Sequence, residues 1–217
     1  WLARLARPDV LKPICNLASC VQKWTRACDK RLYRLICYLN STPHYRLLAC
    51  VQDPPDQLEL RLYTDADFAG ERELGDARST SGGWLCLHGS HTHVPLAWVA
   101  KKQTSTARST TEAETVSMAF SLFSEAIPVW DLWCLLLDKV VPLRLMEDNQ
   151  ATIKVIEDGF SAKLRHMNRV HAVDVSSLNE VVNYEGVSIE YCSTDEMSAD
   201  ISQKLCHLKN GETLWIS

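Results

Sequence analysis

Six acidic side chains, most of them at the ends of predicted strands or the starts of predicted helices, are candidates for chemistry: Asp65, Asp67, Glu112, Glu114, Asp148 and Asp200. Asp65 lies in the second half of a strand-like segment, LELRLYTDADFAG, and Asp148 closes the apolar run LRLMEDN. Carboxylates from separate elements are the ligands that Mg²⁺ takes, rather than Cys or His. The pattern therefore predicts a divalent-cation site. If Asp65 stood alone, a solvated strand face would explain it equally well.

Two periodicities position these acids. The segment before Asp65 alternates apolar and polar residues, so Leu60 and Leu62 share one face of a predicted strand. Glu112 and Glu114 stand at the start of a helical pattern. Because they are two residues apart, their side chains leave the helix in directions about 200° apart around its axis. Only one of the two glutamates can face the site, and the helical pattern does not decide which.

The first 50 residues show helical periodicity only, with a basic second helix from about Thr25 to Asn40. Its cations could follow a phosphate backbone or simply face solvent. Two prolines then interrupt the pattern and predict a linker. The predicted organisation is a helical segment at 1–52, the linker at 53–57, a mixed domain at 58–210 and a tail at 211–217.

Three sequential strands are predicted at 58–68, 84–88 and 94–103, and their short connections favour an antiparallel meander. A helix is expected from Glu112, and Pro128 is expected to kink it or to start a second one.

Ser109, Thr110 or Thr111 can cap the helix that starts at Glu112. The remaining predicted elements are a strand at 143–148, a helix to Ile156, a helix to about Tyr184, a strand at 187–192 and a final helix at 195–208. This order predicts an α/β (α+β) mixed sheet with an antiparallel beginning and parallel later strands.

Composition is that of an ordinary chain with a core: 217 residues, 46% hydrophobic and 23% charged, with a net charge of −4. The charge argues against a protein that coats nucleic acid, but not against a local basic patch.

The apolar runs near 129–137 and 94–100 are too short to span a bilayer and no signal-peptide pattern is seen, so we expect a soluble intracellular protein. The nine cysteines lack metal-binding spacing and are expected to be reduced thiols. The chain starts at Trp1 within a helical pattern, and we expect it to be part of a longer protein.

Six motifs follow one another along the chain: YTDADFAG (63–70), RSTSGGWLCLHG (78–89), AWVAKKQTSTARSTTEAE (97–114), MEDNQATIKV (146–155), LRHMNRVHAV (164–173) and STDEMSADISQKL (193–205). In this order and with these gaps they resemble the ribonuclease H region of copia-type LTR-retrotransposon Pol polyproteins. The segments LARPDV (5–10) and RLYRLICYLNSTPHYRL (31–47) resemble the end of the preceding reverse transcriptase. Three departures from the family pattern concern packing and substrate handling: Phe68 for the usual Trp, Met167-Asn168 for Ile-Asp, and Thr115 where Tyr is common.

The resemblance implies an RNase H-like fold, a five-stranded mixed sheet flanked by helices. It also implies hydrolysis of the RNA strand of an RNA/DNA hybrid with two Mg²⁺ ions, for which Mn²⁺ can substitute. Carried over residue by residue, the catalytic and metal-binding acids are Asp65, Glu114, Asp148 and Asp200, with Asp65 between the ions. Asp67 is not a metal ligand in that family.

The implied partners are an RNA/DNA hybrid and an upstream reverse transcriptase domain of the same polyprotein, with no membrane partner. The implied location is the cytoplasm, within a virus-like particle, with the nucleus as a second location. Oligomeric state stays open. Catalytic decay to a nucleic-acid-binding domain is the main alternative, and a related DNA-cutting nuclease or integrase, which would have a late Glu in place of Asp200, is another.

Substrate contacts are expected from basic side chains for phosphates, and from Thr64, Asn149 and Gln150 for the 2′-hydroxyl or the minor groove. The full set is Thr64, Lys101, Lys102, Arg108, Asn149, Gln150, Lys163, Arg165, His166 and Arg169. Each of these residues could instead be an ordinary polar surface residue.

Overall fold

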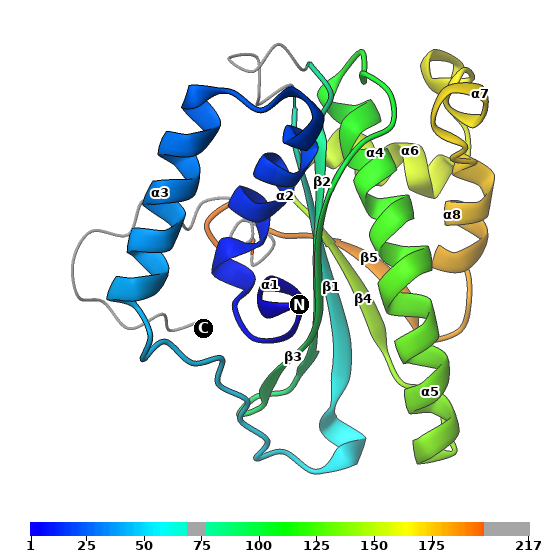
Figure 1. Cartoon of the computed structure of the whole chain (residues 1–217). Helices are drawn as coiled ribbons and strands as arrows, with labels where there is room; N and C mark the ends of the chain where they lie inside the picture. Colours follow the sequence, from blue (N-terminus) through cyan, green and yellow to red (C-terminus); the bar gives the residue numbers. More distant parts are fainter. Residues whose placement is uncertain (69–76, 198–217) are drawn as a thin grey trace.

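The computed structural model describes residues 1–68 and 77–197 (Figure 1). Its centre is a five-stranded sheet in the order β3-β2-β1-β4-β5. The strands are β1 (Glu59–Asp67), β2 (Thr80–His88), β3 (His93–Lys102), β4 (Leu143–Glu147) and β5 (Val187–Tyr191). The first three pair antiparallel, while β4 pairs parallel with β1 and β5 parallel with β4. The predicted mixed sheet is confirmed, and most of the predicted final helix, with Asp200, lies outside the described residues.

Strand β2 begins four residues earlier than predicted. Thr80 pairs with Asp67, and Gly82 pairs with Asp65. Serine, threonine and glycine in this stretch give no alternating hydrophobic signal, so the pattern locates the strand only from Trp84 onward. The early start matters because it places small residues beside the acidic end of β1.

Helix α4 (Thr110–Ser121) continues through a π-helical turn (Leu122–Ala126) into α5 (Ile127–Leu137). Ser109 is its N-cap and accepts a hydrogen bond from the Glu112 backbone N–H. Pro128 stands in the first turn of α5, just after the π-helical turn, and it does not end the helix.

The expectation that the apolar runs are too short to span a bilayer is wrong for this continuous helix. Residues 110–137 form one helix of 28 residues that is long and apolar enough to cross a membrane by length and composition. Those two properties are weak grounds for a span. The α4 half packs against β1 and β2, and both Met118 of α4 and Leu122 of the π-helical turn are fully buried.

The other helices on this face of the sheet are α6 (Gln150–Asp158), α7 (Met167–His171) and α8 (Val175–Val182), with a 3₁₀ turn at Ala162–Leu164 (Figure 1). The helix predicted to end at about Tyr184 corresponds to α8, while the short helix α7 was not predicted. Ala172 adopts a left-handed conformation with φ of 55°, which ends α7. Asp174 then caps α8 by accepting a hydrogen bond from the Ser176 backbone N–H.

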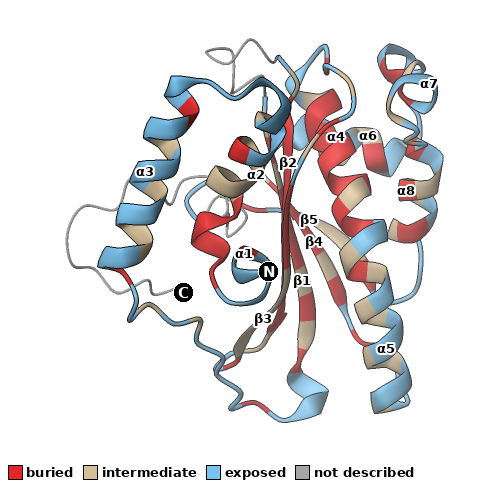
Figure 2. Cartoon of the chain, in the orientation of Figure 1, coloured by how far each residue is buried: buried red, intermediate tan, exposed pale blue. Residues whose placement is uncertain are grey.

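The N-terminal segment covers the opposite face of the sheet (Figure 1). Its helices are α1 (Leu2–Leu5), α2 (Leu11–Ser19) and α3 (Arg26–Ser41), with 3₁₀ turns at Pro8–Val10 and Val21–Lys23. Val10 and Leu11 share a core cluster with Tyr63, Trp84 and Trp98 of the sheet. Figure 2 shows the contrast between the buried sheet and α4 and the largely exposed α3.

The segment 1–52 is thus packed onto the predicted domain 58–210 rather than separated from it by the linker at 53–57. A 3₁₀ turn, Pro55–Gln57, occupies that linker. The boundary between the two parts stays a prediction.

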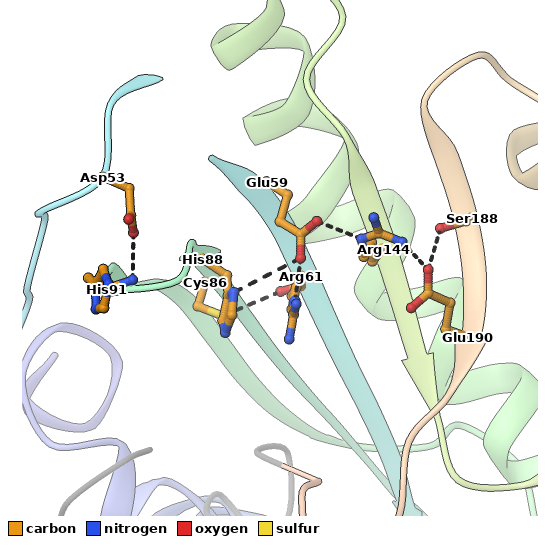
Figure 3. A network of polar contacts seen from close by, with 9 residues as sticks. All are labelled: Asp53, Glu59, Arg61, Cys86, His88, His91, Arg144, Ser188 and Glu190. Carbon is orange, nitrogen blue, oxygen red and sulfur yellow. Dashed lines mark hydrogen bonds and ion pairs between the residues drawn. The ribbon is translucent and has the colours of Figure 1, made fainter. Parts of the chain in front are cut away.

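At the end of the sheet where β1 and β4 begin, charged side chains pair with one another across β1, β4 and β5 (Figure 3). Glu59 accepts hydrogen bonds of 2.6 Å from both Arg61 and Arg144, and Arg144 also pairs with Glu190. Burial acts to raise the pKa of Glu59, but the hydrogen bonds from the two arginines outweigh it and lower that pKa. We attribute a structural role to this network, since its charges are satisfied within it.

Candidate functional site

The acids meet at the opposite end of the sheet, where parallel strands β1 and β4 both end. Tyr63 stands opposite Met146 in that pairing. Continuing the register places Asp65 beside Asp148, which directly follows β4. Adjacent parallel strands therefore deliver two carboxylates to one place.

Helix α4 brings the third acid, Glu114, to the same place. The Ala66 backbone N–H donates a hydrogen bond to the Glu114 carboxylate. The Ser117 hydroxyl, one turn further on, donates to the carbonyl oxygens of Asp65 at 2.7 Å and Gly82 at 3.1 Å. Because one serine bonds both strands, α4 is fixed against the last part of β1 and the first part of β2.

Glu114 lies in surroundings that oppose its charge. Burial raises the pKa of this carboxyl to about 10, and the negative charge of Glu147 adds to the shift. Asp65 and Asp148 contribute in the same direction. The Glu114 side chain is buried, and its Oε2 has no hydrogen-bond partner. A buried carboxyl oxygen without a hydrogen-bond partner, close to other acids, would gain from a nearby cation.

Glu147 is a further acid at this place, one that sequence reasoning missed. It is fully buried, and its carboxylate accepts hydrogen bonds from the Thr64 hydroxyl at 3.1 Å and the Asn149 backbone N–H at 3.2 Å. Burial raises its pKa to about 8 against the effect of those hydrogen bonds. The signal was present in the sequence, since Glu147 continues the buried alternation of Leu143 and Leu145.

The structure separates Glu112 from Glu114, a choice that the helical pattern left open. Glu112 is 1% exposed, and its Oε1 lies 2.9 Å from His166 Nε2 and 3.0 Å from His171 Nε2. Its Oε2 accepts a hydrogen bond from the Arg108 backbone N–H. Glu114 therefore faces the acids, while Glu112 faces two histidines.

The other acids have their own partners. Asp67 forms an ion pair with Lys12 of α2, with 2.7 Å between Nζ and Oδ2. The Asp148 carboxylate accepts a hydrogen bond of 3.0 Å from the Thr194 hydroxyl. The placement of Asp200, the predicted fourth acid, lies outside the described residues.

Most predicted substrate-binding residues lie on the surface, and one does not. Lys101, Arg108, Gln150, Lys163, Arg165 and Arg169 are exposed, and Lys102, Asn149 and His166 are half-buried. Thr64 is fully buried, and its hydroxyl donates to Glu147, so the prediction that it contacts substrate is wrong. The Asn149 side-chain oxygen caps α6 by accepting from the backbone N–H groups of Ala151 and Thr152.

The donor set suits a hard divalent cation, since these side chains offer carboxylate oxygens. In residues 1–68 and 77–197, however, no three His, Cys, Asp or Glu side chains are arranged as a group that could hold a metal ion. Asp65, Glu114 and Asp148 could hold such an ion after their carboxylates close around it. The eight cysteines within the same ranges are free, as predicted.

Comparison with known proteins supports the motif-based interpretation. No family model matches the chain. It is 28% identical over 200 residues to the retrovirus-related Pol polyprotein from transposon RE1 of Arabidopsis thaliana, and 28% identical over 204 residues to that from transposon RE2. Each match covers 91% of the chain and 13% of the polyprotein, so the chain spans a small part of these relatives. The predicted likeness to retrotransposon Pol polyproteins is confirmed.

Among solved structures, the chain is similar to LC11-RNase H1 isolated from compost, with a TM-score of 0.45 and 11% identity over 66% of this chain and 91% of that one. It is also similar to the PFV RNase H domain, with a TM-score of 0.42 and 13% identity over 64% of this chain and 81% of that one.

Proposed function

We propose that this chain is the ribonuclease H part of a retrotransposon reverse transcriptase and that it hydrolyses the RNA strand of RNA/DNA hybrids with divalent cations, Mg²⁺ or Mn²⁺. An upstream polymerase domain in the same polyprotein and a cytoplasmic virus-like particle or nuclear location belong to the same proposal. The observation that carries it is Glu114, a buried carboxyl with an unpartnered oxygen among Asp65, Asp148 and Glu147.

In the proposed site Asp65, Glu114 and Asp148 hold the cations, with Asp200 as the expected fourth ligand. A bound pair of divalent ions would supply an activated water and stabilise the leaving oxygen. Asp65 is suited to the position between the ions, because it lies on the central strand of the sheet, next to β4 and close to α4. Lys12 keeps Asp67 out of the ligand set through their ion pair.

The rest of the site positions these ligands. Ser117 fixes α4 to the ends of β1 and β2, and the Thr64–Glu147 hydrogen bond ties β1 to β4 beneath the acids. A hydrogen bond of this kind holds two strand ends at a fixed separation when it is shielded from water. The carboxylates therefore need little movement of the backbone to meet a cation.

Substrate recognition in this proposal rests on the exposed cations around the site for phosphates and on Asn149 and Gln150 for the 2′-hydroxyl. That hydroxyl distinguishes an RNA strand from a DNA strand.

The test is cleavage of a hybrid with a labelled RNA strand, in Mg²⁺ and in EDTA, with duplex DNA of the same sequence as a control. The proposal predicts RNA cleavage in Mg²⁺, none in EDTA and none of the duplex DNA. Hybrid binding without any cleavage would instead support a decayed, nucleic-acid-binding domain. Cleavage of the duplex DNA would support a DNA nuclease.

A further inference from the structure

The segment between α6 and α8 has two different sides. Its buried side packs Leu164 and Met167 against Val116 of α4 and Val175 of α8. Its outer side carries three exposed cations, Lys163, Arg165 and Arg169. Arg165 also lies over the Phe160 ring, with 5.3 Å between its guanidinium carbon and the ring centroid. We call residues 162–171 the basic segment.

Glu112 fastens this basic segment to the start of α4. One carboxylate oxygen, Oε1, lies within hydrogen-bond distance of both His166 and His171, which are five residues apart. Both the Glu112 and His171 side chains are 1% exposed, so water hardly competes for the contact between them, while His166 is 23% exposed. The Ser105 hydroxyl adds a hydrogen bond of 3.1 Å to the Val170 carbonyl oxygen.

The same glutamate is two residues from Glu114 and is rigidly held. Its backbone N–H donates to the Ser109 hydroxyl, and its Oε2 accepts from the Arg108 backbone N–H. In Figure 1 the start of α4 and α7 lie at the same, upper end of the molecule. Glu112 thus connects the element that carries Glu114 to the element that carries the exposed cations.

We infer that Glu112 is a positioning residue for substrate binding: through His166 and His171 it holds the basic segment where Lys163, Arg165 and Arg169 contact the phosphates of a nucleic-acid strand bound at the acidic site. This inference rests on the proposed function for the kind of ligand. The inference explains why Glu112, a buried acid that does not face the other acids of the site, has both His166 and His171 within hydrogen-bond distance of its Oε1.

The direction in which Glu112→Ala changes the affinity for nucleic acid distinguishes a positioning role from a general effect of net charge. Replacing Glu112 by Ala makes the chain more positive, which by itself strengthens binding to a polyanion. If Glu112 positions the basic segment, Glu112→Ala instead weakens binding, because phosphate contacts are lost. Glu180→Ala removes the same charge from an exposed position on α8 and serves as the matched control.

The experiment measures the affinity of the chain for a fluorescently labelled RNA/DNA hybrid in EDTA over a series of salt concentrations. We expect Glu112→Ala to weaken binding about tenfold at low salt and to reduce the slope of log affinity against log salt by about 2 to 3, one unit for each lost phosphate contact. Glu180→Ala is expected to bind as tightly as the wild type or slightly more tightly. An unchanged affinity and slope for Glu112→Ala would overturn the inference.

Two further variants guard against a loss of folding. His166→Ala removes one of the two contacts at a less buried position and is expected to give an intermediate loss of affinity and slope. Adding Glu112→Ala to the Arg165→Ala/Arg169→Ala double variant should cause a smaller loss than in the wild type, because two of the three positioned charges are already gone. Full additivity would contradict the inference.

These measurements use no divalent cation, so they separate this inference from the proposed activity. Loss of binding in Glu112→Ala together with no hybrid cleavage by the wild type would reject the nuclease and keep the positioning role. Cleavage by the wild type together with unchanged binding by Glu112→Ala would support the nuclease and reject the positioning role.

Discussion

Glu114 and Glu147 are acids in places where negative charge is costly. Both are buried, the charge of Glu147 raises the cost of ionising Glu114, and the charges of Asp148 and Asp65 do the same for Glu147. Such groups keep their protons in the folded chain at pH values where the unfolded chain has lost them. The metal-free site is therefore expected to reduce stability at neutral pH.

Glu147 gives this expectation a defined pH range. Its pKa is about 8 in the folded chain against an ordinary value of 4.5. Below pH 4.5 Glu147 is protonated in both the folded and the unfolded chain, and its contribution to stability is fully present. As the pH rises toward 8, Glu147 ionises first in the unfolded chain, so this contribution is lost. We predict that the free energy of unfolding in EDTA falls between these pH values and that Glu147→Gln lacks part of this fall. Urea unfolding across that range measures it, and parallel curves for the two proteins would reject the prediction.

For single residues, the sequence predicted the acids of the site better than it predicted the roles of Thr64 and Glu112. Chemistry and motif order pointed to Asp65, Glu114 and Asp148, and in the structure the charges of Asp65 and Asp148 act on Glu114. The Thr64 side chain is buried beneath α4 and bonds Glu147, which its residue type does not reveal. From residue type alone, Thr64 was therefore predicted to contact substrate. The partners of Glu112 come from a segment more than 50 residues away, which no local pattern could show.

Helix α4 reaches the site because it packs unusually close to β2. A Cβ atom added at Gly83 would lie 2.4 Å from Ser121 Oγ and 2.8 Å from Ser121 Cβ. No real side chain tolerates contacts that short, so the two small residues set the distance between helix and sheet.

Gly83→Ala should therefore push α4 away from the sheet. We expect a loss of about 1–3 kcal/mol in the free energy of unfolding, the range for overpacking a core. The second-site change Ser121→Gly removes both contacting atoms, so the alanine should cost less in that background than in the wild type. Urea unfolding of the four proteins checks this, and an equal cost of the alanine in both backgrounds would show that the close approach is not the cause.

Elements with a clear hydrophobic period were predicted well, and those without one were not. Strands β1, β3, β4 and β5 and helix α3 lie within a few residues of their predicted positions. Strand β2 was placed too late because its first residues are small and polar. The short helix α7 was not predicted, and it ends at a left-handed Ala172, a conformation that alanine seldom adopts.

The whole molecule has cores on both faces of its sheet, and the N-terminal helices supply part of one. The Trp98 indole N–H donates a hydrogen bond of 2.6 Å to the Ala3 carbonyl oxygen, and this contact is buried. Lys12 connects the same segment to Asp67 near the site. Docking of the segment 1–52 should therefore contribute to the stability of the sheet.

Trp98→Phe tests this connection between the segment and the sheet. We expect a loss of about 1–3 kcal/mol in the free energy of unfolding, since the substitution leaves a buried carbonyl oxygen without its donor. Trp24→Phe breaks an indole hydrogen bond to Asp29 that is exposed, so its cost should stay below about 1 kcal/mol. Equal costs for the two variants in urea unfolding would mean that the Trp98 contact is not an anchor.

The most direct test of the central claim replaces one acid without changing its shape. Asp65→Asn keeps the size of the side chain and removes the charge expected to lie between two cations. With Mg²⁺ and an RNA/DNA hybrid, we predict cleavage of the RNA strand by the wild type and a decrease of at least about a hundredfold in Asp65→Asn, a loss typical for removal of a main electrostatic contribution. Hybrid cleavage at the wild-type rate by the folded Asp65→Asn protein would contradict the claim that Asp65, Glu114 and Asp148 form a metal-dependent nuclease site.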